Sequence, residues 1–116
     1  MLTITEAQLA GLEAAQRERF AHELTQRLRT TGDPSIAKLP DAELLRRVDA
    51  GLRVGRHYQV SEERDLMLLA LAHVLFGADL LAQPDKSFVA QILGGGIGLN
   101  DNRVFRIDQR LRALPG

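Results

Sequence analysis

Along most of this chain, apolar residues recur at intervals of about three or four residues. The first such series is Leu9, Leu12, Phe20, Leu24 and Leu28. Charged residues take the other faces of the same segment, so the pattern predicts one long helix over residues 6–29. Thr3 and Glu6 have the spacing of a capping box at its start. The following TTGDPS, residues 30–35, is predicted to break the helix.

Two further helices are predicted in the middle of the chain. One begins near Pro40, which suits a first helical turn, and ends around Gly55 and HYQV. Its apolar stripe is Leu44, Leu45, Val48 and Leu52. The other has Ser61 as N-cap and is apolar around nearly its whole circumference in residues 66–76, as expected of a central helix packed on several sides. Gly77 is expected to end it in a left-handed conformation.

In the last third of the chain, the apolar pattern predicts a short helix over residues 87–93 and a final helix that starts at Asn100 or Asp101. The final helix places Val104, Ile107, Leu111 and Leu114 on one face and Arg103, Arg106, Arg110 and Arg112 on the other. No segment has the alternating, β-branched pattern of a strand. We therefore predict an all-α fold in one domain, residues 1–116: a compact bundle of about five helices with a glycine-rich loop before the last.

The glycine-rich segment QILGGGIGLND raises the question of a phosphate-binding loop. Gly94, Gly95, Gly96 and Gly98 fall within five residues. A Walker loop or a dinucleotide fingerprint needs a preceding strand, and the Walker loop also needs a following Gly-Lys-Ser/Thr. A helix precedes this segment, so we interpret it as a helix stop and a connection. Ile97, apolar among glycines, is a candidate contact for a partner.

Composition and charge limit the classes of function. The 116 residues are 45% hydrophobic and 26% charged, with 15 basic and 15 acidic residues. That neutral balance argues against a polyanion as main partner, because phosphate affinity comes from accumulated Lys and Arg. There is no cysteine and no signal-like start, and the longest apolar stretch is shorter than the ~20 residues of a membrane span. We expect a cytoplasmic protein with no membrane partner.

No motif for catalysis, metal binding or a cofactor emerges. HELTQ, residues 22–26, has Gln26 where a zinc-binding helix needs its second histidine. His73 is expected to be hydrogen-bonded within the core, and His57 to complement a helix dipole. No serine lies in a nucleophile elbow. We therefore predict that the protein is not an enzyme and has no cofactor.

Charge is distributed unevenly along the chain. Residues 27–56 carry seven basic and four acidic side chains, whereas residues 61–85 carry one basic and five acidic ones. A positive side and a negative side could steer a charged protein partner. The arginines of the last helix could instead lie on phosphates, so a small helical DNA-binding regulator is the alternative hypothesis, although no helix-turn-helix spacing accompanies them.

Two stretches together resemble a known group of proteins. The opening carries Met1, Leu2, Ile4, Phe20, Leu24 and Leu28, and the centre carries Tyr58, Val60, Glu63, Asp65, Phe76, Gly77 and Asp79. In this the chain resembles small, helical, largely uncharacterised bacterial proteins encoded in type VI secretion effector clusters, near spike-tip and toxin genes. The resemblance implies an accessory role, as adaptor, chaperone or immunity factor, and brings no catalytic residues.

These observations favour a module that binds another protein, which the resemblance suggests is a secreted effector or a spike-tip protein. Self-association stays open. The candidate contacts are arginines of the last helix, the acidic start of the third helix and the glycine-rich loop: Arg103, Arg106, Arg110, Glu62, Asp65 and Ile97.

Overall fold

The computed structural model describes residues 6–95 and 102–114, with side chains from residue 14 onward. Its elements are α1 (Glu6–Arg29), α2 (Pro34–Ala37), α3 (Asp41–His57), α4 (Glu63–Phe76), the 3₁₀ turns η1 (Leu80–Ala82) and η2 (Pro84–Lys86), α5 (Phe88–Leu93) and α6 (Arg103–Arg112). Every regular element in these ranges is a helix, which confirms the all-α bundle. No helix found there is long and apolar enough to cross a membrane.

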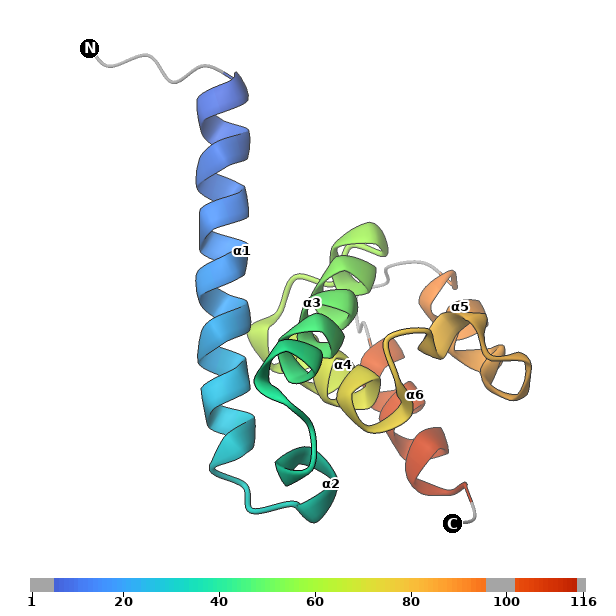
Figure 1. Ribbon diagram of the computed structural model, residues 1–116. Coiled ribbons are helices and arrows are strands. Elements are labelled where there is room, and N and C mark those ends of the chain that lie inside the picture. The colour runs from blue at the N-terminus through green and yellow to red at the C-terminus, as the bar shows by residue number, and fades with distance from the viewer. Residues whose placement is uncertain (1–5, 96–101, 115–116) are drawn as a thin grey trace.

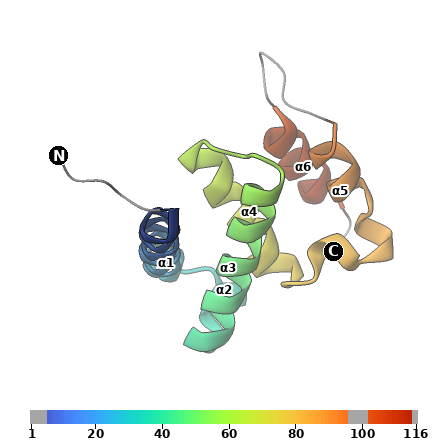
Figure 2. The same ribbon diagram turned by 90° about the horizontal axis from the view of Figure 1, so that it is seen from above.

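The helices pack in the order α1, α3, α4, α6 and α5, with α4 at the centre (Figures 1 and 2). Buried side chains form two clusters, one toward α1 and α3 and one toward α5 and α6. Helix α4 belongs to both, since Ala70 and Val74 lie in the first and Leu69 and Ala72 in the second. The predicted central helix is thereby confirmed.

The boundaries differ from the prediction at several places. The break after α1 contains α2, a single turn whose N-cap Asp33 accepts a hydrogen bond from the Ser35 amide at 2.8 Å. Helix α4 begins after Glu62 instead of Ser61. Gly77 ends α4 with φ 112°, as expected. The predicted starts of the last helix, Asn100 and Asp101, lie outside the described residues.

Helix α3 ends at His57, within the stretch from Gly55 through HYQV that was predicted to mark its end. The helix continues through Gly55 and is closed by a Schellman motif, in which the Gln59 amide donates to Arg56 O at 3.2 Å and the Val60 amide to Gly55 O at 2.8 Å. Gln59 takes the left-handed position of this motif, with φ 59°, where glycine is usual. The turn that closes α3 thus lies within HYQV, after Gly55.

Gly51 and Gly55 allow α3 to approach α4 closely. A Cβ atom on Gly51 would lie 2.6 Å from Ala70 Cα, and one on Gly55 would lie 2.5 Å from Leu66 Cδ2. The first contact is with backbone and the second with the end of a side chain that can rotate. The two helices therefore touch most closely where α3 has no side chain.

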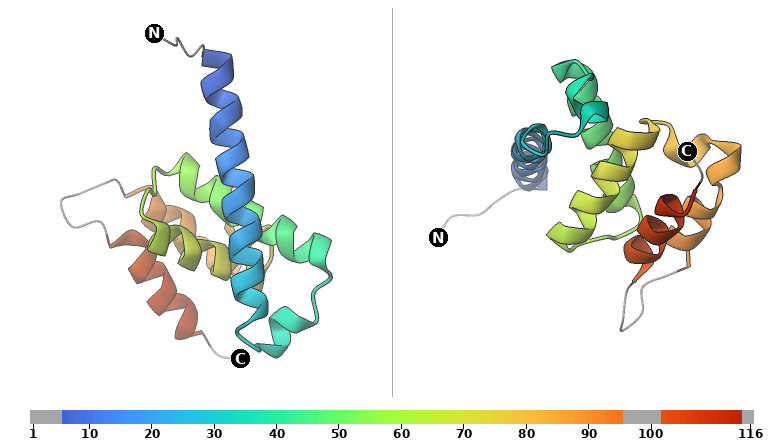
Figure 3. Two further views of the ribbon diagram at one scale, coloured as in Figure 1. Left: turned by 90° about the vertical axis from the view of Figure 1, so that its left-hand side faces the viewer. Right: turned by 90° about the horizontal axis from the view of Figure 1, so that it is seen from below.

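The long α1 extends past the rest of the molecule at its N-terminal end (Figure 3, left). The longest dimension is 57 Å and the radius of gyration is 15.3 Å. A globular domain of this length has a radius of gyration near ~13 Å, so the excess reflects this extension. The packed body is formed by the C-terminal half of α1 and the elements after it.

We expect Gly51→Ala to lower the free energy of unfolding by about 1–3 kcal/mol, because the added methyl group forces backbone apart. Alanine in place of glycine inside an exposed helix would instead raise stability. Gly55→Ala should cost less than Gly51→Ala, since Leu66 can move. Urea denaturation of both variants tests this order, and equal or reversed losses would contradict it.

A candidate partner-binding groove

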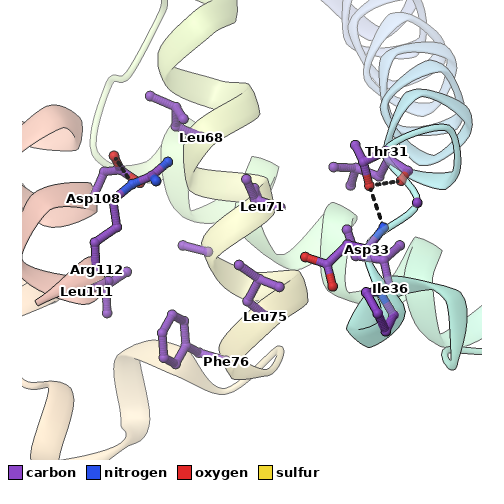
Figure 4. A pocket seen from close by; sticks show the side chains of 14 residues that line it. Thr31, Asp33, Ile36, Leu68, Leu71, Leu75, Phe76, Asp108, Leu111 and Arg112 are labelled. Carbon is purple, nitrogen blue, oxygen red and sulfur yellow. Dashed lines mark hydrogen bonds and ion pairs between the residues drawn. The ribbon is translucent and has the colours of Figure 1, made fainter. Parts of the chain in front are cut away.

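A groove of about 630 Å³ runs along α4, between α6 and the corner where α1 meets α2 (Figure 4). Leu68, Leu71 and Leu75 form its floor. Their spacing of three and four residues places them on one face of α4. Leu68 and Leu71 are half-buried and Leu75 is 43% exposed. The face of the central helix that neither core cluster covers fully is thus apolar.

The α6 wall of the groove is formed by Asp108, Leu111 and Arg112. Leu111 is buried against the body. Asp108 and Arg112 form an i,i+4 ion pair at 2.9 Å on the rim. Their charges therefore offset each other next to the apolar floor.

The opposite wall consists of Leu28, the turn after α1, and α2. Its polar groups are hydrogen-bonded locally: Thr31 Oγ1 donates to Leu28 O at 2.8 Å and accepts from the Asp33 amide at 3.3 Å. Figure 4 shows Thr31 and Asp33 at this rim and Ile36 beside them. A ligand that covers this wall would leave these bonds intact.

Arg29 holds the α1–α2 corner in place. Its guanidinium donates to Ile36 O at 2.9 Å and Leu39 O at 2.6 Å, and pairs with Asp41 at 2.7 Å. One side chain thus connects the end of α1 to the end of α2 and the start of α3. Sequence periodicity gave no sign of this role, because an arginine bound to backbone carbonyls leaves no spacing pattern.

Arg103 is not the exposed contact that was predicted. It is 4% exposed and donates to Tyr58 O at 2.9 Å and to Leu93 O at 2.7 Å. Arg103 precedes Ile107 by four residues and so lies on the buried face of α6. Its role is to join the start of α6 to the ends of α3 and α5.

The other candidate residues do not form a common surface with the groove. Arg106 and Arg110 are exposed on α6, and Arg110 lies over the Phe88 ring at 4.1 Å. Glu62 is exposed and Asp65 half-buried at the start of α4. None of these four lines the groove. Ile97 lies outside the described residues, as do Gly96 and Gly98.

The predicted face of α6 is formed in part. Val104, Ile107 and Leu111 are buried, whereas Leu114 is 38% exposed. Of the four arginines predicted on the other face, Arg103 is buried, whereas Arg106, Arg110 and Arg112 are exposed. Arg110 lies over the Phe88 ring and Arg112 pairs with Asp108.

Four arginines of residues 27–56 pair with nearby acids: Arg29 with Asp41, Arg46 and Arg47 with Glu43, and Arg53 with Asp49. Hydrogen bonds from Arg46 and Arg47 lower the pKa of Glu43 to about 2. Arg47 also donates to Val74 O at 2.9 Å, which ties α3 to α4. Arg46 and Arg53, whose side chains are 65% and 70% exposed, form their ion pairs at the surface of α3.

The three histidines remain apart, in α1, α3 and α4. His22 and His57 are exposed, and His57 is in the last turn of α3 as expected. His73 is fully buried, with Nδ1 2.8 Å from Leu69 O, which confirms its predicted place in the core. Within the described ranges, no three His, Asp or Glu residues are grouped as metal ligands would be.

No family model matches the chain, and neither a curated protein nor a solved structure matches it. The function proposed below is therefore inferred from the groove and its walls.

We expect Arg103→Met to lower the free energy of unfolding by about 2–4 kcal/mol, because two buried carbonyls lose a charged donor. Arg106→Met, at an exposed position of the same helix, should change stability by less than about 0.5 kcal/mol. Guanidinium denaturation measures both. If Arg103→Met lost as little stability as Arg106→Met, the two hydrogen bonds of Arg103 would not stabilise the fold, which would contradict this expectation.

His73 should make stability fall in mild acid. Burial lowers the pKa of His73 below its ordinary value of 6.5, although the hydrogen bond to Leu69 opposes this. As pH falls below 6.5, the unfolded chain takes up the proton first, and the free energy of unfolding drops by up to about 1.4 kcal/mol per pH unit. The loss ends once pH passes the lower pKa of the folded state.

Urea denaturation from about pH 7.5 to 5 tests this expectation. His73→Met should flatten the dependence, and His22→Gln, at an exposed position, should leave it unchanged. A slope that persists in His73→Met would assign the acid sensitivity to other groups.

Proposed function

We propose that this chain is a non-enzymatic protein-binding module, and that its α4 groove receives the apolar face of a helix from the partner. The observation that carries the proposal is the apolar floor of Leu68, Leu71 and Leu75, with Leu75 43% exposed on the central helix. Such a stripe exposed between two walls is typical of helix-in-groove recognition.

The dimensions of the groove support a helical ligand. From Leu68 to Leu75, α4 rises about 10 Å, the length of two helical turns. A partner helix with apolar residues at positions i, i+3 or i+4, and i+7 would match this stripe. On the rim, the Thr31 hydroxyl both donates and accepts a hydrogen bond, so covering it leaves neither its donor nor its acceptor role unpaired.

The biological setting we propose is an accessory role for a secreted bacterial effector, as adaptor, chaperone or immunity protein. Support for this setting comes from the resemblance of the opening and central segments to proteins of type VI secretion effector clusters. A helix-binding groove suits each of the three roles, because each requires a stable complex with another protein.

The test is binding to the purified products of the neighbouring effector and spike-tip genes, measured by isothermal titration. Leu75→Gln should weaken the complex by at least about tenfold, since a central apolar anchor is worth roughly 1.4–2 kcal/mol. Phe105→Gln is the matched control, because Phe105 is 47% exposed on α6 and does not line the groove.

Two results would contradict the proposal. One is that none of these gene products binds the wild-type protein. The other is that Leu75→Gln binds as tightly as wild type while Phe105→Gln binds weakly, which would move the interface to the outer face of α6.

A further inference from the structure

The N-terminal part of α1 extends beyond the packed body (Figure 3, left). Of the α1 side chains that are described, from residue 14 onward, the buried ones are Ala21, Leu24 and Leu28, all in the C-terminal half. A helical segment of fewer than about 12–15 residues is only marginally stable in water unless something packs on it. A surface that covers the extension would therefore stabilise it.

The extension carries two leucines on a face of α1 next to the buried one. Positions 9, 12, 16 and 20 follow one another at intervals of three, four and four residues, so they share one face of the helix. They are Leu9, Leu12, Gln16 and Phe20. The apolar series of the extension thus leads along α1 to Phe20, where the helix meets the body.

A hollow of about 620 Å³ lies at that point, between α1 and the start of α4. Gln16 and Phe20 line it from α1, and its apolar wall on the other side consists of Leu52, Val60 and Leu66. The hollow shares no lining residue with the α4 groove, so its occupant is a separate question.

We propose that the protein forms a two-fold symmetric dimer, in which two α1 helices pack antiparallel and the extension of each copy covers the hollow of the other. With Leu9 of one copy opposite Phe20 of the second, Leu12 comes opposite Arg17, at the edge of the hollow. Because α1 is one continuous helix, a copy cannot fold its extension onto its own hollow. A second copy supplies both surfaces at once, and the two-fold arrangement closes on itself as a dimer.

The charges of the two surfaces are complementary. The part of α1 before residue 14 carries Glu6 and Glu13 and no basic residue. Among the described residues that line the hollow are Arg17 and Arg56, and none of them is acidic. In the antiparallel register, Glu13 of one copy lies within one residue of the level of Arg17 in the other. Opposite signs at these positions favour this register and this occupant.

The test is sedimentation equilibrium of the full chain from about 5 μM to 1 mM, where the wild type should approach twice the mass of one chain. Leu9→Gln and Leu12→Gln should each weaken the dimer by at least about tenfold, because each removes an apolar contact that occurs twice in a two-fold interface. Leucine and glutamine have similar helix propensities, so these changes leave α1 able to form.

The matched control is Leu75→Gln, which changes the exposed leucine of the α4 groove and does not touch the hollow. It should leave the dimer as stable as that of the wild type. A wild type that stays monomeric at 1 mM would overturn the proposal. So would a dimer that Leu75→Gln weakens and Leu9→Gln does not, since self-association would then use the groove.

The antiparallel register is tested by cross-linking, which is simple because the chain has no cysteine of its own. Gln16→Cys and Gln26→Cys place single thiols at two exposed positions of α1. Along the helix axis, the two copies of residue 16 would be offset by about 5 Å and those of residue 26 by about 35 Å. A short bis-maleimide should therefore link Gln16→Cys and not Gln26→Cys. No link at position 16, or equal linking at both positions as parallel helices would give, contradicts the proposed register.

Discussion

The close contact between α3 and α4 at Gly51 and Ala70 is the constraint on which the other packing depends. Because a Cβ on Gly51 would fall 2.6 Å from Ala70 Cα, α3 and α4 can lie this close only with glycine there. Their close approach places α4 at the centre, with α1 packed on α3 and α6 packed on α4 (Figure 1). The apolar stripe of α4 left between those two outer helices becomes the floor of the groove.

Arginines complete this arrangement by binding backbone carbonyls at element ends. Arg103 joins α6 to the ends of α3 and α5, Arg29 joins α1 to α2 and α3, and Arg47 reaches a carbonyl of α4. Carbonyls at helix ends lack partners within the helix, so a guanidinium can satisfy several at once. Three of the 15 basic residues thereby serve as internal connections between helices.

Sequence periodicity predicted the helices well, because each needs an apolar face that repeats every three to four residues. It located the end of α3 in the stretch from Gly55 through HYQV, but it did not reveal that Gly55 permits a close approach to α4 or that Gln59 takes the left-handed position of the closing turn. Arg103 was assigned to the surface by its charge, although its position relative to Ile107 placed it inward. The groove itself arises from the relative placement of four elements, which no local pattern encodes.

The membership of α4 in both hydrophobic clusters has a consequence for how the molecule unfolds. Leu69 and Ala72 pack toward α5 and α6, while Ala70 and Val74, on the same turns, pack toward α1 and α3. Neither half can lose its packing without exposing a face of the helix that the other half needs. Unfolding of the packed body is therefore a single cooperative transition, and a ligand held anywhere along α4 stabilises both halves together.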